Sequence, residues 1–144
     1  MNNFNFWQKW LYYTSIFFAF VGIAVALFNN SILFDLWNHY LKIWLGIEGE
    51  LPANLLKFKT FILAPLGGTI AGSYVLMAFI AKYPFRNREK WAWQAATFSL
   101  LTWFVVDSSL CFYHGAYFNI VLINLFTLVV QGLPLVFTRK YFEV

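Results

Sequence analysis

The sequence predicts an all-α integral membrane protein, a four-helix bundle with an amphipathic helix on the outer membrane surface. Three observations lead to this prediction. Hydrophobic residues make up 61% of the chain and charged residues 11%, against about 25% charged residues in soluble domains. Four apolar runs are each long enough to cross a bilayer. Basic residues gather beside alternate ends of these runs. At 144 residues, the chain is expected to form one domain, 1–144.

The four predicted spans cover residues 11–28, 61–81, 91–113 and 118–137. A hydrocarbon core takes about 20 helical residues, with a usual range of about 17 to 25. Backbone groups in lipid must be satisfied within the segment, so each run is expected to be helical. A secretory signal is the alternative for the first run, because Lys9 precedes it and residues 24–26 resemble a cleavage site. We expect a span, because the run exceeds a signal core of about 7–15 residues.

The basic residues predict the orientation of the chain. Most of the ten Lys and Arg residues lie before the first run, between the second and third, or after the fourth. Cytoplasmic loops carry an excess of Lys and Arg, so both termini are expected in the cytoplasm. The residues on this side are Lys9, Lys82, Arg86, Arg88, Lys90, Arg139 and Lys140.

An amphipathic helix is expected over residues 32–45, in the long loop between the first two runs. Apolar pairs recur at helical spacing from Ile32 to Leu45, and Gly46 can end the helix. Asn38 and His39 belong to the opposite, polar face. The pattern predicts a helix that lies flat on the outer leaflet, and a lid over the bundle is the alternative.

Asp107 is the one ionisable residue well inside a run, and it is the centre of the predicted site. A carboxylate at the bilayer centre costs at least about 2.5 kcal/mol on insertion scales. At 1.5 Å per residue, Asp107 lies roughly 10 Å below the outer end of its run. Asn124 lies at nearly the same depth in the last run, which follows a very short turn and must be an antiparallel neighbour. We therefore expect Asp107 to face the bundle interior and to contact Asn124 or Asn119.

Other polar groups are expected to share this outer pocket. Cys111 and His114 follow Asp107 by four and seven residues on one helical face, and Trp103 precedes it by four. Asp107 and His114 are the candidate catalytic groups. The alternative is that Asp107 only fixes helix register through hydrogen bonds. The predicted ligand-binding residues are Trp103, Asp107, Ser108, Cys111, His114, Asn119 and Asn124.

Gly68 and Gly72 in the second run have the small-xxx-small spacing that lets membrane helices approach closely. This spacing favours a role in helix packing over a ligand site.

No metal, cofactor or nucleic acid is expected. His39 and His114 fall in different segments, and no second carboxylate joins Asp107 at helical spacing. Haem between the two histidines is an alternative that would need the loop helix to fold over the bundle. The single cysteine excludes an intrachain disulfide. The basic residues form short clusters beside apolar runs, which does not favour nucleic-acid binding.

Several segments of the second half carry a family resemblance: 83–86 (Tyr-Pro-Phe-Arg), 89–93 (Glu-Lys-Trp-Ala-Trp), 103–108 and 114–119 (His-Gly-Ala-Tyr-Phe-Asn). They resemble a group of small bacterial four-span membrane proteins of uncharacterised activity. The resemblance implies the same topology and no activity, and it places the chain in a bacterial inner membrane. Sterol-isomerase-like and sigma-2-like four-span proteins also place acids in a bundle, but this chain has one intramembrane acid.

Three functions fit the sequence. The leading hypothesis is a non-enzymatic module that binds lipid or a hydrophobic small molecule, or a subunit that packs against another copy or another membrane protein. The second is an enzyme on a lipid- or sterol-like substrate, with Asp107 as general acid or base and His114 or Asn124 orienting the reactive group. The third is a proton or ion path in an oligomer, because these helices have too few polar groups to line a pore alone.

Overall fold

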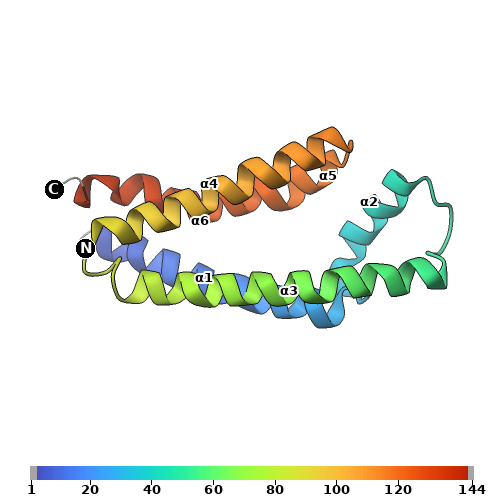
Figure 1. Ribbon diagram of the computed structural model, residues 1–144, viewed down its shortest axis with the longest axis horizontal. Coiled ribbons are helices and arrows are strands. Elements are labelled where there is room, and N and C mark those ends of the chain that lie inside the picture. Colours follow the sequence, from blue (N-terminus) through green and yellow to red (C-terminus); the bar gives the residue numbers. More distant parts are fainter. Residues whose placement is uncertain (1–2, 143–144) are drawn as a thin grey trace. The chain divides into compact units, whose positions relative to one another are not determined.

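The computed structural model describes residues 3–142, and this part of the chain is helical apart from its turns (Figure 1). Within it, four helical segments are long and apolar enough to cross a membrane. They are Asn3–Phe28 (α1), Ala53–Lys82 (α3), Lys90–Tyr113 (α4) and the composite segment Tyr117–Tyr141. The structure therefore has four helical segments of membrane-spanning length and composition where four spans were predicted, and these indicate an integral membrane protein.

Two helices are longer than the apolar runs that predicted them. α1 begins at Asn3 rather than at residue 11, and α3 begins at Ala53 rather than at residue 61. An apolar run marks the part of a helix that can lie in the hydrocarbon core. Helical hydrogen bonding continues beyond it, where polar and charged side chains are solvated. The ranges 11–28 and 61–81 therefore give the apolar parts of these helices and not their ends.

The fourth segment is not one regular α-helix. It consists of α5 (Tyr117–Asn119), a π-helix (η2, Ile120–Leu125), α6 (Phe126–Thr138) and a 3-10 turn (η3, Arg139–Tyr141). Pro134 lies inside α6 and lacks the N–H that would bond the carbonyl of Val130. The indole nitrogen of Trp10 donates to that carbonyl at 2.9 Å. A side chain of α1 thus replaces the hydrogen bond that the proline removes.

The chain divides into two compact units, and each is described by itself. The first unit comprises described residues 3–17 and 74–142, which include the start of α1, the end of α3, α4 and the whole fourth segment. The second unit comprises residues 18–73, which include the rest of α1, a 3-10 turn (η1, Ile32–Phe34), α2 (Asp35–Leu45) and the first part of α3.

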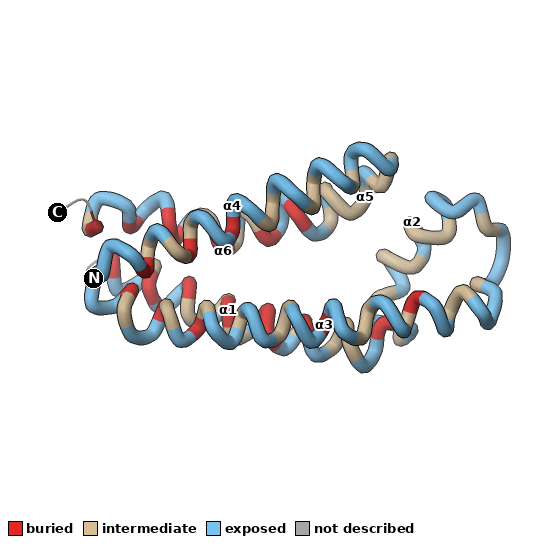
Figure 2. The backbone as a smooth tube through the Cα atoms, in the orientation of Figure 1, coloured by how far each residue is buried: buried red, intermediate tan, exposed pale blue. Residues whose placement is uncertain are grey.

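The core of the first unit lies near the turn between α3 and α4, where its buried positions gather (Figure 2). The rings of Phe4, Phe85 and Phe142 are fully or almost fully buried, and the centroids of Phe85 and Phe142 lie 4.8 Å apart. Arg88 has a φ of 61°, rare for a non-glycine residue, and its guanidinium carbon lies 4.9 Å from the Phe4 ring centroid. The aromatic cluster fixes this end of the unit.

Helix ends in the first unit are closed by side chains of neighbouring helices. The buried Gln8 amide donates to the carbonyl of Ala81, in the last turn of α3, at 2.8 Å. The Trp93 indole donates to the carbonyl of Leu135 in the last turn of α6 at 2.9 Å. Carbonyls of a last helical turn lack the usual backbone donor, and these side chains supply donors that lipid could not; the Leu135 carbonyl also accepts from Thr138 Oγ1 of α6 at 3.5 Å.

In the second unit, α1 and α3 approach through glycine. A Cβ on Gly22 would lie 2.5 Å from the backbone nitrogen of Ala71, and one on Gly67 would overlap the backbone of Ala26. A Cβ on Gly68 or Gly72, the predicted packing pair, would meet no atom within 4 Å. The close approach within this chain therefore uses Gly67, the neighbour of the predicted residue, because helix rotation decides which glycine faces the partner.

α2 lies within the range predicted for the amphipathic helix and ends at Gly46, which has a φ of 66°. Such a left-handed residue is the usual way to end a helix, and glycine adopts it without strain. The position of α2 on the outer leaflet stays a prediction.

Candidate functional site

Asp107 lies in the last two turns of α4, which turns back directly into the fourth segment. His114 ends α4, and Gly115 follows with a φ of 71°. The N–H of Ala116 then donates to the carbonyl of Cys111 at 2.8 Å. This glycine turn makes α4 and the fourth segment antiparallel neighbours, which lie side by side in Figure 1. It brings Asn119 and Asn124 back alongside Asp107.

Both asparagines of the fourth segment donate to the same carboxylate oxygen. The amide nitrogen of Asn124 lies 2.7 Å from Asp107 Oδ2, and that of Asn119 lies 3.3 Å from it. The Cys111 thiol lies 3.6 Å from this oxygen, and Asn124 also donates to Ser108 Oγ at 3.0 Å. The expected contact of Asp107 with Asn124 and Asn119 is thus present.

The π-helix explains how two asparagines five positions apart can reach one oxygen. In an α-helix, such residues point about 140° apart around the axis, given about 3.6 residues per turn. Residues 120–125 form a π-helix, whose wider turns bring positions i and i+5 closer to one face. Segments of this kind occur frequently at functional sites. Nothing in the apolar sequence of this segment predicts the π-helix.

The site presents a buried acceptor that lacks a donor. Asn124 is fully buried, and its Oδ1 has no hydrogen-bond partner. Its nitrogen faces Asp107 and Ser108, so the oxygen points elsewhere. Asp107 is half-buried, and the hydrogen bonds from Asn119 and Asn124 both go to its Oδ2. A hydroxyl or an ammonium group has the chemistry to donate to Asn124 Oδ1 and to Asp107 Oδ1.

The remaining predicted residues are divided between this site and its surroundings. Ser108 and Cys111 belong to the hydrogen-bonded cluster. Trp103 is half-buried and packs against the apolar core. His114 is exposed at the turn, with its ring centroid 5.0 Å from that of Tyr113. No cluster of three or more His, Cys, Asp or Glu residues that could hold a metal ion occurs among residues 3–142.

A second polar cluster lies in the second unit and has a buried lysine at its centre. Lys59 Nζ donates to Asn38 Oδ1 at 2.7 Å and to the carbonyl of Asn29 at 3.1 Å. Asn38 Nδ2 donates to the same carbonyl at 3.2 Å. Asn38 was expected on the solvated face of its helix; in the structure it points inward because it accepts a hydrogen bond from the lysine. Sequence reasoning missed this cluster, since its residues come from three separate elements.

Comparison with protein-family models finds no match, and neither the curated proteins nor the solved structures contain a match to this chain. The functional argument therefore rests on the geometry of the site.

Proposed function

We propose that this protein is a non-enzymatic membrane protein that binds an amphipathic molecule in the outer half of the bilayer, alone or as a subunit of a membrane complex. The polar end of the ligand, a hydroxyl or an ammonium group, donates to Asn124 Oδ1 and Asp107 Oδ1. Its apolar part lies along the exposed apolar surface of α4 and of the fourth segment.

The unpartnered oxygen of Asn124 carries this proposal. Leaving a buried acceptor without a donor costs about 1–3 kcal/mol. Asn124 Oδ1 is such an acceptor, while the nitrogen of the same amide makes two hydrogen bonds. A bound donor offsets that cost. Gln131 also has a buried oxygen without a partner, but its nitrogen donates to Thr14 and not to a carboxylate.

The chemistry of the cluster favours binding over catalysis. Asp107 Oδ2 accepts from the amides of Asn124 and Asn119, and an amide neither takes up nor releases a proton as a general acid or base does. The other candidate catalytic group, His114, is exposed at the turn. The enzymatic alternative requires the ligand itself to be altered at Asp107, so recovery of a chemically unchanged ligand distinguishes the two functions.

Identification of co-purifying molecules tests the proposal. The full chain is extracted in mild detergent, examined by native mass spectrometry, and its organic extract is analysed. We expect a molecule with an apolar tail and a hydroxyl or amine group on the wild-type protein. It is lost from the Asn124→Leu variant and retained by Gln131→Leu, which removes an equally buried amide elsewhere on the same segment.

Two results would overturn the proposal. One is a wild-type protein with no bound amphipathic molecule, and the other is equal retention by Asn124→Leu and Gln131→Leu. Conversion of the added molecule to a product of different mass by the wild type, and not by Asp107→Asn, would replace binding with catalysis.

The proposal includes an orientation with both termini in the cytoplasm of a bacterial inner membrane. It is supported by the seven basic residues on the terminal side and by an even number of spans. A cysteine at Gly49 should react with an impermeant reagent added outside intact cells, and one at Asn87 should not, both in a Cys111→Ala background. The opposite pattern would invert the topology.

A further inference from the structure

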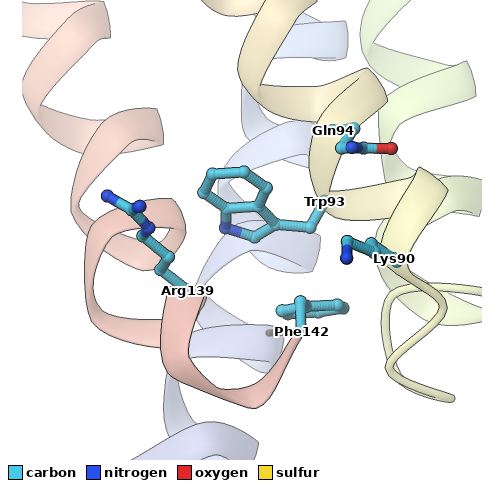
Figure 3. A pocket seen from close by; sticks show the side chains of 5 residues that line it. All are labelled: Lys90, Trp93, Gln94, Arg139 and Phe142. Atoms are coloured by element: carbon cyan, nitrogen blue, oxygen red, sulfur yellow. The ribbon is translucent and has the colours of Figure 1, made fainter. Parts of the chain in front are cut away.

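A separate cavity of about 280 Å³ lies at the other end of the first unit, between the start of α4 and the end of the fourth segment. Figure 3 shows the Trp93 indole between the side chains of Lys90 and Arg139. Its volume is close to the lower limit of ligand pockets, about 300 Å³, and suits a compact polar group. The lining residues are Lys90, Trp93, Gln94, Arg139 and Phe142.

Two of the described residues that line the cavity are basic, and none of them is acidic. Lys90 and Arg139 bring two positive charges from separate elements, and Gln94 adds an amide. Glu89 precedes Lys90, but its carboxylate accepts from the Trp91 indole at 2.6 Å. Lys90 is also the first residue of α4, and the positive end of a helix dipole favours a bound anion. Charge and hydrogen-bond donors therefore select an anion.

The walls of the cavity are held in place before any ligand binds. The indole nitrogen of Trp93 is bonded to the carbonyl of Leu135 at 2.9 Å, and Phe142 is 4% exposed in the aromatic core. The side chains of Lys90 and Arg139 are exposed. A fixed aromatic wall beside two exposed cations can admit a charged group from the side that faces solvent.

The depth of the cavity indicates which anion reaches it. Lys90 begins the third membrane-spanning helix, and Arg139 lies in the last turn of the fourth segment. The cavity is thus at the level where apolar spans give way to the headgroup region. Basic pockets between membrane helices bind anionic headgroups at this level, and tryptophan is enriched there.

We infer that this cavity binds a phosphate group, supplied by the headgroup of an anionic phospholipid, with Lys90 and Arg139 as its charged contacts and Gln94 as a further donor. The acyl chains of this lipid extend along the exposed apolar faces of the adjoining helices. This site is independent of the Asp107 site, so either proposal can fail without the other.

Binding of short-chain lipids to the purified full chain in neutral detergent tests the inference. The probes are dihexanoyl phosphatidylglycerol, dihexanoyl phosphatidylcholine and inorganic phosphate, followed by isothermal titration calorimetry. We expect the phosphatidylglycerol to bind most tightly. The Lys90→Gln/Arg139→Gln protein should bind it about tenfold more weakly, given the contribution of two cations close to one anion.

The matched control is Lys9→Gln/Arg86→Gln, which removes the same two residue types from exposed positions outside the cavity. It should bind within about threefold of wild type, because only diffuse attraction is lost. Circular dichroism checks that both variants keep their helices. Equal weakening in both variants would overturn the inference. Inorganic phosphate binding as tightly as phosphatidylglycerol would overturn the lipid as its source.

Discussion

Asn124 and Asp107, on opposite arms of a tight helical turn, are joined by a 2.7 Å hydrogen bond from the amide nitrogen to Oδ2. The asparagine is fully buried and the aspartate half-buried. The bond therefore fixes the register between α4 and the fourth segment. It also turns the unpartnered Asn124 oxygen away from Asp107 Oδ2. The structural role and the proposed binding role thus meet in one pair of residues, and substitutions can separate them.

The first prediction separates these roles at Asp107. Asp107→Asn keeps an oxygen that can accept from Asn124 and should leave the free energy of unfolding nearly unchanged. Asp107→Leu removes the acceptor and should lower it by about 1–2 kcal/mol, the upper range for hydrogen bonds between membrane helices. Unfolding in mixed detergent micelles, followed by circular dichroism, measures both. Equal stability of the Leu variant and the wild type would show that the pair does not hold the helices together.

The second prediction concerns the glycine contact of α1 with α3. Gly67→Ala should destabilise the protein by about 1–3 kcal/mol, because the new methyl group overlaps the Ala26 backbone. Gly68→Ala is its matched control, since a Cβ there meets nothing within 4 Å. It should be neutral or slightly stabilising, because alanine favours the helix. Thermal unfolding measures the stability of both variants. A larger loss of stability in Gly68→Ala than in Gly67→Ala would show that Gly67 does not face α1.

The third prediction is a coupling between Trp10 and Pro134. Trp10→Phe leaves the carbonyl of Val130 without its donor and should cost about 0.6–1.7 kcal/mol. Pro134→Ala restores a backbone N–H to that carbonyl, so Trp10→Phe should cost less in this background. A double-mutant cycle of unfolding free energies measures the difference. An identical cost of Trp10→Phe in both backgrounds would show that Trp10 does not compensate for the N–H that Pro134 lacks.

The fourth prediction concerns the buried Lys59. Asn38→Leu removes its closer acceptor and should destabilise the protein by about 1.5–3 kcal/mol, as for other hydrogen bonds to charged groups. His39→Leu, at an exposed neighbouring position, should have little effect. Lys59→Met should recover part of the loss in the Asn38→Leu protein, because it removes a buried charge that is left with the Asn29 carbonyl as its acceptor. Failure of Lys59→Met to recover any stability would show that the lysine is already solvated.

The spans were predictable because lipid leaves the backbone no alternative to helix. Composition and run length were sufficient to place four of them in order. The helix ends were not predictable, since α1 and α3 continue into polar sequence that carries no apolar signal. The adjacent glycines of α3 both satisfy the packing motif. Only the rotation of α3 against α1 decides that Gly67, and not Gly68, lies at the contact.

The contact between Asp107 and Asn124 was predictable, because it follows from the depth of the two residues in the membrane. Counting the rise along each helix placed Asp107 and Asn124 at one level, and the structure joins them. The π-helix that allows Asn119 to join Asn124 has no sequence signature here. The Lys59 cluster depends on three elements that meet only in the folded chain. Sequence therefore located the costly charge in the spans but not the lysine cluster.

An experimental density map of the protein in lipid nanodiscs tests the central claim most directly, because it shows what touches Asn124 and Asp107. We expect non-protein density within hydrogen-bonding distance of Asn124 Oδ1 and Asp107 Oδ1, about 2.6–3.2 Å, continuing into an apolar tail. A map in which the Asp107 side chain points into lipid, or in which the chain's own donors occupy both oxygens with no added density, would contradict the binding site.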